Sequence, residues 1–328
     1  MLALVCPGQG SQAPGMLAPW LEVPGVAERL RWASAVVGPV SGGGGAPLDL
    51  LAHGTASDAD TVRDTAVAQP LIVAAGLAAA AALWPGGLLA GGGPTDVVVA
   101  GHSVGELTAA ALAGALSTEA ALVLVRERGR AMAAAATRTA TGMSAVVGGR
   151  PEEVEAAIAA SGATAANRNA AGQVVAAGTA EQLAALAAAP PAKARVIALQ
   201  VAGAFHTEHM APARAELEAL APGLTATDPA LPLLSNADGA EVRAGRDVLD
   251  RIVAQVTSPV RWDLCSDALV ARGVSAVLEL SPAGTLAGLA KRAMPGVEIV
   301  ALKGPEDLDA ARDLVARHAH RTPGSASA

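Results

Sequence analysis

A serine flanked by two glycines stands at the junction of a predicted strand and a predicted helix. The strand is the run Asp96-Val97-Val98-Val99-Ala100, the turn is Gly101-His102-Ser103-Val104-Gly105, and the helix begins at Glu106. A strand that enters G-x-S-x-G and leaves as a helix holds its serine on a strained turn that the glycines permit. The free N–H groups and positive dipole end of the helix face whatever the serine attacks. The pattern therefore predicts an α/β fold and a nucleophile at Ser103.

Composition limits the functions open to the chain. Of its 328 residues, 52% are hydrophobic and 16% are charged, which is enough for a large core. The net charge is −7 and aromatic residues make up 2%, whereas a nucleic-acid surface needs a basic face and stacking rings. Cys6 and Cys265 stand outside any C-x-x-C pattern, as is typical of free thiols in a reducing compartment. We expect a cytoplasmic monomer that binds no nucleic acid.

One uncharged stretch, 66–95, is long enough to cross a bilayer. Much of it is alanine and glycine, Pro85-Gly86-Gly87 interrupts it, and no lysine or arginine lies close to either end. We interpret it as a buried helix from about Pro70 to Trp84, followed by a Gly-rich connection. The apolar start, 1–6, lacks a basic region and runs into a glycine loop, which predicts a first strand rather than a signal peptide. Neither segment predicts a membrane protein.

Strands alternate with helices along most of the chain, which predicts a parallel sheet covered on both faces. Between 134 and 201 the order becomes β-α-β-β-α-β, the pattern of ferredoxin-like domains. We therefore predict a large α/β subdomain, 1–133 and 202–328, into which a small ferredoxin-like subdomain, 134–201, is inserted. For the large part we expect strands at 2–6, 96–100, 231–235 and 275–280, a Gly/Pro-rich loop at 38–47, and helices at 15–37, 70–84, 118–135, 208–220, 246–257 and 263–272.

A hydroxyl nucleophile needs a base, and the chain has six histidines. Three of them lie in polar or Ala/Gly-rich segments typical of solvated side chains: His53, His318 and His320. His102 adjoins Ser103, but neighbouring side chains at such a turn point in divergent directions. His206 lies where a strand-like segment gives way to a helix, at an edge from which a base can reach Ser103. His209, three residues further on, is the alternative candidate.

Arg128 lies on the apolar face of the predicted helix 118–135. At 100° per residue it shares that face with Ala121, Leu124, Val125 and Met132. Its neighbours Arg126, Glu127 and Arg130 point the other way and are expected to be solvated. An inward-facing arginine must meet an anion, because an unpaired buried charge is very costly. Two interpretations remain open: an internal carboxylate partner, or a bidentate clamp on a substrate carboxylate.

A glycine loop, Pro7-Gly8-Gln9-Gly10-Ser11-Gln12, follows the first predicted strand. Its glycines allow backbone N–H groups to approach an oxyanion. The same loop is compatible with a plain strand-to-helix turn or a phosphate loop, although it lacks the G-K-[ST] ending of a P-loop.

Taken together, these segments resemble the malonyl-CoA:acyl carrier protein transacylases of bacterial fatty acid synthesis and the acyltransferase domains of polyketide synthases. The resemblance runs in order along essentially the whole chain. Its motifs are Pro7-Gly8-Gln9-Gly10-Ser11-Gln12, Gly101-His102-Ser103-Val104-Gly105-Glu106, Arg126-Glu127-Arg128-Gly129, Asn167-Arg168-Asn169, Gly172-Gln173-Val174-Val175, Gly203-Ala204-Phe205-His206, Ser235-Asn236-Ala237-Asp238-Gly239, Gln255, Ser258-Pro259-Val260 and Glu279-Leu280-Ser281-Pro282-Ala283-Gly284-Thr285-Leu286.

The resemblance implies a fold and a set of residue roles. The fold is a hydrolase-like α/β core that carries a ferredoxin-like subdomain. Ser103 would be acylated, with His206 as its general base. The remaining roles are backbone N–H groups of Gln9 and Val104 as the oxyanion hole, Arg128 as the malonyl-carboxylate ligand, and the backbone carbonyl of Gln255 as the group that orients the histidine.

Phe205 bears on the choice of acyl group. In polyketide acyltransferases a phenylalanine just before the histidine accompanies malonyl, and a serine there accompanies methylmalonyl. The resemblance thus implies malonyl, although Gly203 departs from the histidine usual at the start of that tetrad. It further implies transfer from malonyl-CoA to the phosphopantetheine thiol of acyl carrier protein in two steps, with no metal or bound cofactor.

Two other functions are compatible with parts of the pattern. A serine hydrolase such as a thioesterase shares the nucleophile and base, but it expects an Asp or Glu triad member and leaves Arg128 without a role. A non-catalytic module that docks a carrier protein would have no need of Ser103, His206 and Arg128 together.

For docking of the acidic carrier protein we expect a local basic surface, with Lys193, Arg195, Lys291 and Arg292 as candidates.

Overall fold

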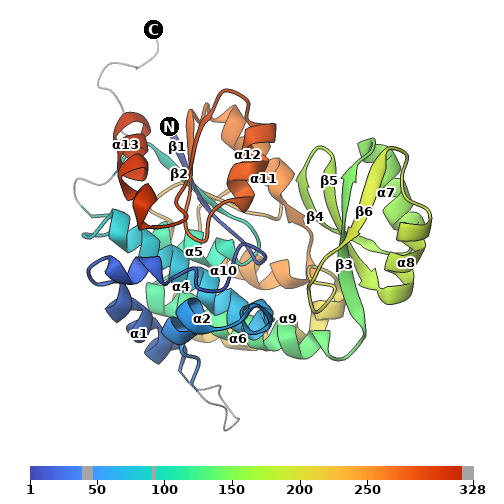
Figure 1. The fold of residues 1–328 in the computed structure, drawn as a ribbon, viewed down its shortest axis with the longest axis horizontal. Helices are drawn as coiled ribbons and strands as arrows, with labels where there is room; N and C mark the ends of the chain where they lie inside the picture. The colour runs from blue at the N-terminus through green and yellow to red at the C-terminus, as the bar shows by residue number, and fades with distance from the viewer. Residues whose placement is uncertain (39–46, 91–93, 320–328) are drawn as a thin grey trace.

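The structure is a computed structural model that describes residues 1–38, 47–90 and 94–319. His320 and the expected loop 38–47, apart from its two end residues, lie outside the described residues. Within them, the chain forms a larger body around a six-stranded sheet and a smaller lobe around a five-stranded sheet, which lie side by side (Figure 1).

The six strands of the large sheet follow the order β11-β10-β1-β2-β7-β8. Neighbours are parallel except β7 and β8, which are antiparallel. In β1 and β2, Cys6 lies opposite Gly101, so the loops that follow these two strands meet at one edge of the sheet. The strands are β1 (Leu2–Cys6), β2 (Val97–Gly101), β7 (Leu233–Leu234), β8 (Glu241–Val242), β10 (Ala276–Glu279) and β11 (Glu298–Ala301).

Both faces of this sheet are buried, because alternate residues of each central strand enter different cores. In β1, Leu2 and Leu4 belong to one hydrophobic cluster, whereas Ala3 and Val5 belong to a second cluster on the other face. Such two-sided burial explains why the strands appear in the sequence as uninterrupted apolar runs. The predicted parallel sheet with two covered faces is confirmed.

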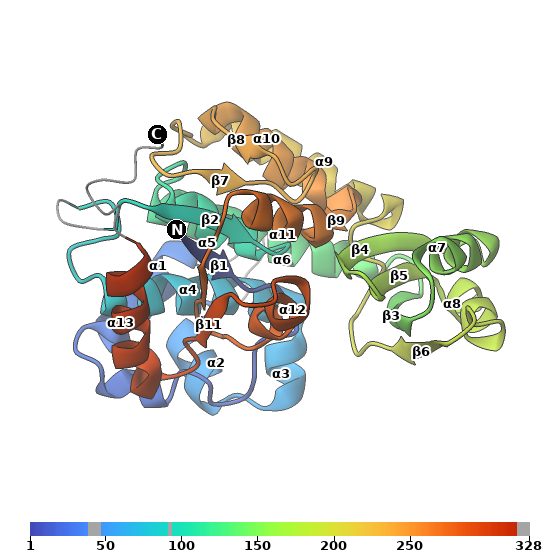
Figure 2. The ribbon, with the colours of Figure 1, turned by 90° about the horizontal axis from the view of Figure 1, so that it is seen from above.

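Helices supply the cover on each face. The first cluster is closed by α4, α5 and α6 together with α10 and α13, and the second by α11 and α12 (Figure 2). The α-helices of the large body are α1 (Val26–Val37), α2 (Leu50–Ala56), α3 (Ala59–Arg63), α4 (Thr65–Leu83), α5 (Gly105–Leu112), α6 (Thr118–Ala136), α9 (Ala211–Leu220), α10 (Gly245–Ala254), α11 (Trp262–Ala271), α12 (Thr285–Ala293) and α13 (Leu308–His318). The 3-10 turns are η1 (Pro19–Glu22), η2 (Glu208–Met210), η3 (Ala221–Gly223), η4 (Gln255–Thr257) and η5 (Pro305–Asp307).

Helix α4 is the central helix of the larger body. Among the described residues it alone has the length and apolarity to cross a membrane, but 72% of its 18-residue window is buried inside the fold. It begins five residues before the expected Pro70, because the Asp64 side chain caps it by accepting the N–H of Ala66. Pro70 therefore lies inside the helix, where it has no N–H to donate to the carbonyl of Ala66.

The smaller lobe has the predicted β-α-β-β-α-β order. Its antiparallel sheet follows β6-β3-β5-β4, and its own core includes Val146, Ile158 and Leu186. A fifth strand, β9 (Val260–Arg261), joins β4 from the larger body, so the two parts share one sheet. The elements are β3 (Thr141–Gly148), α7 (Pro151–Ala160), β4 (Thr164–Ala170), β5 (Gln173–Thr179), α8 (Ala180–Ala188) and β6 (Ala194–Ala198).

Some expected elements differ in their bounds. The helix predicted over 15–37 is divided into η1 and α1, because Gly25 adopts a φ of +84° between them. The short strands β8, β9 and β11 have no counterpart in the sequence-based prediction. His318, expected in a solvated tail, ends α13 and contacts the Glu298 carboxylate.

Candidate active site

The turn between β2 and α5 presents Ser103 as the glycine pattern predicts. Ser103 has a φ of +52°, in the left-handed region that side chains rarely occupy. A Cβ on Gly101 would lie 2.1 Å from the carbonyl carbon of Gly105, and one on Gly105 would lie 2.2 Å from the Cys6 oxygen. Only glycine fits at these two positions, so the turn stays tight and carries Ser103 at its tip.

His206, rather than His209, contacts the serine. The Oγ of Ser103 lies 2.8 Å from Nε2 of His206, whose Nδ1 lies 2.9 Å from the backbone oxygen of Gln255. Because a carbonyl can only accept, Nδ1 carries the proton and Nε2 is free to accept one from the serine. His206 is buried and has a φ of +62°. Of the two candidate histidines, the structure brings His206 to the serine, whereas the backbone N–H of His209 donates to the Thr207 hydroxyl.

Burial keeps this histidine neutral. Desolvation, followed by the positive charge of Arg128, lowers the pKa of His206 to about 3. A neutral imidazole with a free Nε2 is the form that can take a proton from a serine hydroxyl. The arrangement therefore supports base-assisted nucleophilic attack.

Arg128 projects from α6 to the other side of Ser103. Its Nη1 donates to Oε1 of Gln69 at 2.6 Å, and its Nη2 donates to Oε1 of Gln255 at 2.8 Å. The Nη2 also lies 3.4 Å from the serine Oγ. The Nε is buried and has no hydrogen-bond partner among the described residues. A buried guanidinium with donors to spare, next to a nucleophile, is a site for an anion.

The internal-carboxylate alternative is met in part by Glu106, in the first turn of α5. Glu106 accepts the Nε2 hydrogen of Gln255, so one amide separates its carboxylate from Arg128. Burial raises the pKa of Glu106 to about 7, and the N–H of Asn236 and the charge of Arg128 partly offset that rise. The pKa of Arg128 is lowered by burial to about 10, so the guanidinium stays charged at neutral pH. Arg128 thus has an ionisable carboxyl group nearby but no direct carboxylate contact within the described residues.

The glycine loop after β1 packs against the serine turn. A Cβ on Gly8 would lie 2.7 Å from the His102 carbonyl oxygen, so the two loops are in close contact. Within the described part of the chain, the backbone N–H groups of Gln9 and Val104 donate no hydrogen bond. Gln9 lines the same cavity as Ser103. Two free N–H groups beside a nucleophile can receive an oxyanion.

One expectation about α6 is wrong. Arg126 was expected to be solvated, but it is buried, with an exposure of 6%. Its Nη1 lies 3.4 Å from the oxygen of Ala66, the carbonyl that Pro70 leaves without a helical partner. The missing proline N–H in α4 therefore provides an acceptor for Arg126, which helical periodicity within α6 alone does not reveal.

The serine opens into a cavity of about 410 Å³ between the larger body and the smaller lobe. Phe205 lies on its wall, and so does His102, whose Nε2 lies 2.8 Å from Oδ1 of Asn169. Residues of both parts form the lining, among them Gln9, Gln69, Met132, Asn167, Val175 and Leu289. The cavity thus joins the nucleophile to solvent through a mixed polar and apolar channel.

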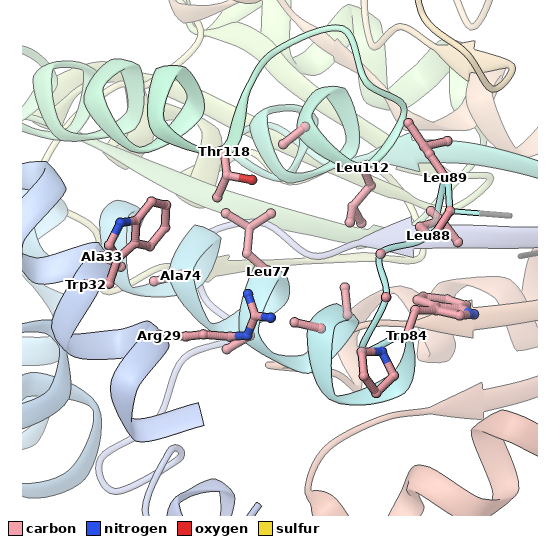
Figure 3. A pocket seen from close by; sticks show the side chains of 18 of the residues that line it. Arg29, Trp32, Ala33, Ala74, Leu77, Trp84, Leu88, Leu89, Leu112 and Thr118 are labelled. Carbon is pink, nitrogen blue, oxygen red and sulfur yellow. The ribbon is translucent and has the colours of Figure 1, made fainter. Parts of the chain in front are cut away.

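A second cavity, of about 370 Å³, lies at the other end of α4, α5 and α6 (Figure 3). Its wall is mostly apolar and includes Trp32, Leu77, Trp84 and Leu112, and the charged side chain of Arg29 lines it beside Leu77. It contains none of the residues that surround Ser103.

Three buried polar residues of the site were not singled out from the sequence. Gln69 is the one amide side chain in the uncharged stretch 66–95, and Glu106 is the one charged residue of helix α5. Both are polar exceptions within apolar segments, which is a usable signal. Glu106 and Asn236 also stand within motifs of the resemblance, which assigned neither a role.

Comparison with known proteins places this geometry in a family. The model of the acyl transferase domain family matches residues 3–311. The malonyl CoA-acyl carrier protein transacylase of Mycobacterium tuberculosis (strain ATCC 25618 / H37Rv) is 49% identical over 315 residues, covering 96% of this chain and 100% of the relative. That of Bacillus subtilis (strain 168) is 31% identical over 319 residues, covering 94% and 96%.

Solved structures of malonyl transacylases are similar to this chain over nearly its whole length. The crystal structure of MCAT from Mycobacterium tuberculosis superposes with a TM-score of 0.88 at 49% identity, covering 95% of this chain and 99% of that one. A type II PKS acyl-carrier protein in complex with its malonyl-transacylase gives a TM-score of 0.84 at 29% identity, covering 95% and 99%. The two-part α/β fold predicted from the sequence is shared with these structures. The chain belongs to the acyl transferase family and, within it, to the malonyl CoA-acyl carrier protein transacylases.

Proposed function

We propose that this protein moves a malonyl group from malonyl-CoA to the phosphopantetheine thiol of acyl carrier protein, through a malonyl ester on Ser103. The observation that carries the proposal is the position of the Ser103 Oγ, 2.8 Å from the base His206 and 3.4 Å from the cation Arg128. A hydrolase acting on neutral esters needs the first contact and not the second. A nucleophile placed between a base and an anion-binding cation suits an acyl group that carries its own carboxylate.

In the first step, the Ser103 Oγ attacks the thioester carbonyl while Nε2 of His206 takes its proton. The oxyanion is received by the N–H groups of Gln9 and Val104. Collapse of this intermediate breaks the C–S bond, and the departing CoA thiolate takes the proton from His206. The products are malonyl-Ser103 and free CoA.

The second step is the same chemistry in reverse. His206 takes the proton of the carrier thiol, the thiolate attacks the ester carbonyl, and the serine oxygen leaves with the proton. Thioester and oxygen ester are close in energy, so the transfer runs in both directions. The steps use only side chains and backbone groups of this chain, and they call for no metal or bound cofactor.

The malonyl carboxylate has two roles in this proposal. It binds the guanidinium of Arg128, which fixes the distance of the carbonyl from Ser103. It also offsets the positive charge that helps to lower the pKa of His206, so an acid substrate makes the histidine a stronger base. Phe205, on the cavity wall beside the histidine, limits the space next to the malonyl methylene.

Gln255 links the two halves of the site. Its backbone carbonyl orients His206 and its side-chain oxygen contacts Arg128. We propose that the small part, 134–201, and the large part, 1–133 and 202–328, are the two subdomains that enclose the substrate. We further propose that the protein acts as a cytoplasmic monomer, a state that sedimentation equilibrium measures directly.

The deciding experiment combines intact-mass spectrometry with a transfer assay. Incubation with malonyl-CoA should add one malonyl mass to the wild type and none to Ser103→Ala, because loss of such a nucleophile costs a factor of about a million. CoA release should then continue only while phosphopantetheinylated acyl carrier protein is present. Steady CoA release without the carrier would instead identify a thioesterase, and malonylated Ser103→Ala would remove Ser103 as the nucleophile.

A further inference from the structure

The turn that follows β7 carries a buried side chain that none of these steps uses. Asn236 stands in the segment Ser235-Asn236-Ala237-Asp238-Gly239 and has an exposure of 0%. It lies beneath the serine turn, on the side away from the cavity, and does not line that cavity. A buried amide is costly unless all of its groups are bonded, so its contacts indicate what it holds in place.

The side chain of Asn236 links Gly101, the first residue of the serine turn, to Ser103 at its tip. Its Oδ1 accepts the backbone N–H of Ser103 at 2.7 Å, and its Nδ2 donates to the backbone oxygen of Gly101 at 2.7 Å. Because one partner can only donate and the other can only accept, the orientation of the amide is fixed. The amide thereby bonds one backbone acceptor and one backbone donor of the same turn.

Surrounding groups hold this amide in turn. The backbone N–H of Asn236 donates to Oε1 of Glu106 at 2.6 Å, and Nε2 of Gln255 lies 3.3 Å from the Asn236 Oδ1. The same Nε2 lies 3.2 Å from the backbone oxygen of Ser103. Asn236 is therefore fixed by the neighbours of Arg128 and His206.

The contact matters because Ser103 is in a strained conformation, with a φ of +52°. The bond to Asn236 directs the Ser103 N–H away from the cavity and stabilises the backbone conformation that places Oγ beside His206. Relaxation of that turn would move Oγ and the adjacent Val104 N–H together. Displacements of about 1 Å in reacting groups cost about a hundredfold in rate.

We propose that Asn236 is a positioning residue for the nucleophile: its amide ties Gly101 to Ser103 and holds the serine turn in its reactive conformation. This inference rests on the proposed role of Ser103. Since Asn236 does not touch the clamp Arg128, it acts on the rate of acylation and not on recognition of the malonyl carboxylate.

The test is Asn236→Ala, with Ser235→Ala as the matched control. Ser235 lies in the same turn, and among the described residues its Oγ accepts only the Ala237 N–H and makes no hydrogen bond to the serine turn. We expect Asn236→Ala to lower the rate of malonyl loading, and of acetyl loading, about a hundredfold, with the malonyl-to-acetyl ratio unchanged. The dissociation constant for malonyl-CoA, measured in a Ser103→Ala background, should be the same with and without Asn236→Ala. Ser235→Ala should load at the wild-type rate.

A second measurement tests the proposal if the alanine variant folds poorly. The rate constant for labelling of Ser103 by phenylmethylsulfonyl fluoride counts folded sites only and needs no carboxylate clamp. Asn236→Asp keeps an acceptor for the Ser103 N–H but loses the donor to Gly101, so it should label more slowly than the wild type. Wild-type loading and labelling rates in these variants, or a changed malonyl-to-acetyl ratio, would overturn the proposal. An unlabelled Ser103 in the wild type would instead contradict the proposed nucleophile itself.

Discussion

Truncation of Arg128 separates an enzyme for acyl groups that carry a carboxylate from one for simple acyl groups. The guanidinium has an exposure of 1%, so a malonyl carboxylate bound to it is removed from water. Leaving such a charge without its partner costs about 2–5 kcal/mol. Gln69 remains in place, and its amide can turn an N–H toward the carboxylate. We therefore expect the lower part of that range, about 2–3 kcal/mol, or about thirty- to 150-fold in kcat/KM for malonyl-CoA.

The assay is the ratio of malonyl to acetyl loading rates in Arg128→Ala and the wild type. Acetyl-CoA has no carboxylate to lose, so its loading should stay unchanged or improve. Arg126→Ala is the matched control, because that arginine is also buried in α6 but contacts the backbone of α4 and not Ser103. It should reduce thermal stability and leave the ratio as it is. If Arg128→Ala lowered stability and slowed both substrates alike, the clamp assignment would be refuted.

Three further outcomes follow from the geometry. Because the pKa of His206 is lowered from 6.5 to about 3, its neutral form contributes stability that is complete above pH 6.5 and is lost as the pH falls toward 3. In thermal melts, the wild-type Tm should therefore drop more steeply below pH 6.5 than the Tm of His206→Gln, and parallel curves would contradict the shift. Gly105→Ala places a Cβ 2.2 Å from the Cys6 oxygen and should abolish malonyl loading. The control Gly288→Ala, in α12, adds a Cβ with no described atom outside its own helix within 4 Å, so this variant should load normally and melt at or above the wild-type temperature. In stopped-flow assays, the rate of transfer to acyl carrier protein should fall from low to high salt, and the double variant Lys291→Ala/Arg292→Ala should show a weaker salt dependence. The reason is that both side chains are exposed and Arg292 contacts Gln173 on the cavity wall.

Local chemistry made part of the site predictable from the sequence. The serine turn depends on two glycines whose Cβ atoms would collide with the backbone, so its pattern is visible in five adjacent residues. The inward face of α6 follows from helical periodicity, which placed Arg128 among buried neighbours. The β-α-β-β-α-β order of the smaller lobe likewise appears as consecutive segments.

The features that the sequence did not predict depend on contacts between distant segments. Arg126 is buried because Pro70, in another helix, leaves a carbonyl free, and no pattern within α6 contains that information. Strand β9 pairs with β4 across 93 residues of chain and is only two residues long, so neither length nor alternation marks it. The role of Asn236 depends on bonds to a turn more than 130 residues earlier.

One residue, Gln255, contacts both His206 and Arg128. This double contact explains why the Asp or Glu of a hydrolase triad is unsuited to this site. Gln255 places its backbone oxygen on His206 and its side-chain oxygen on Arg128. A carboxylate side chain in that place would pair directly with Arg128 and compete with the malonyl group for it. The buried acid Glu106 is instead held one amide away, so it leaves guanidinium donors of Arg128 free. Specificity for an acid substrate thus requires a neutral group behind the histidine.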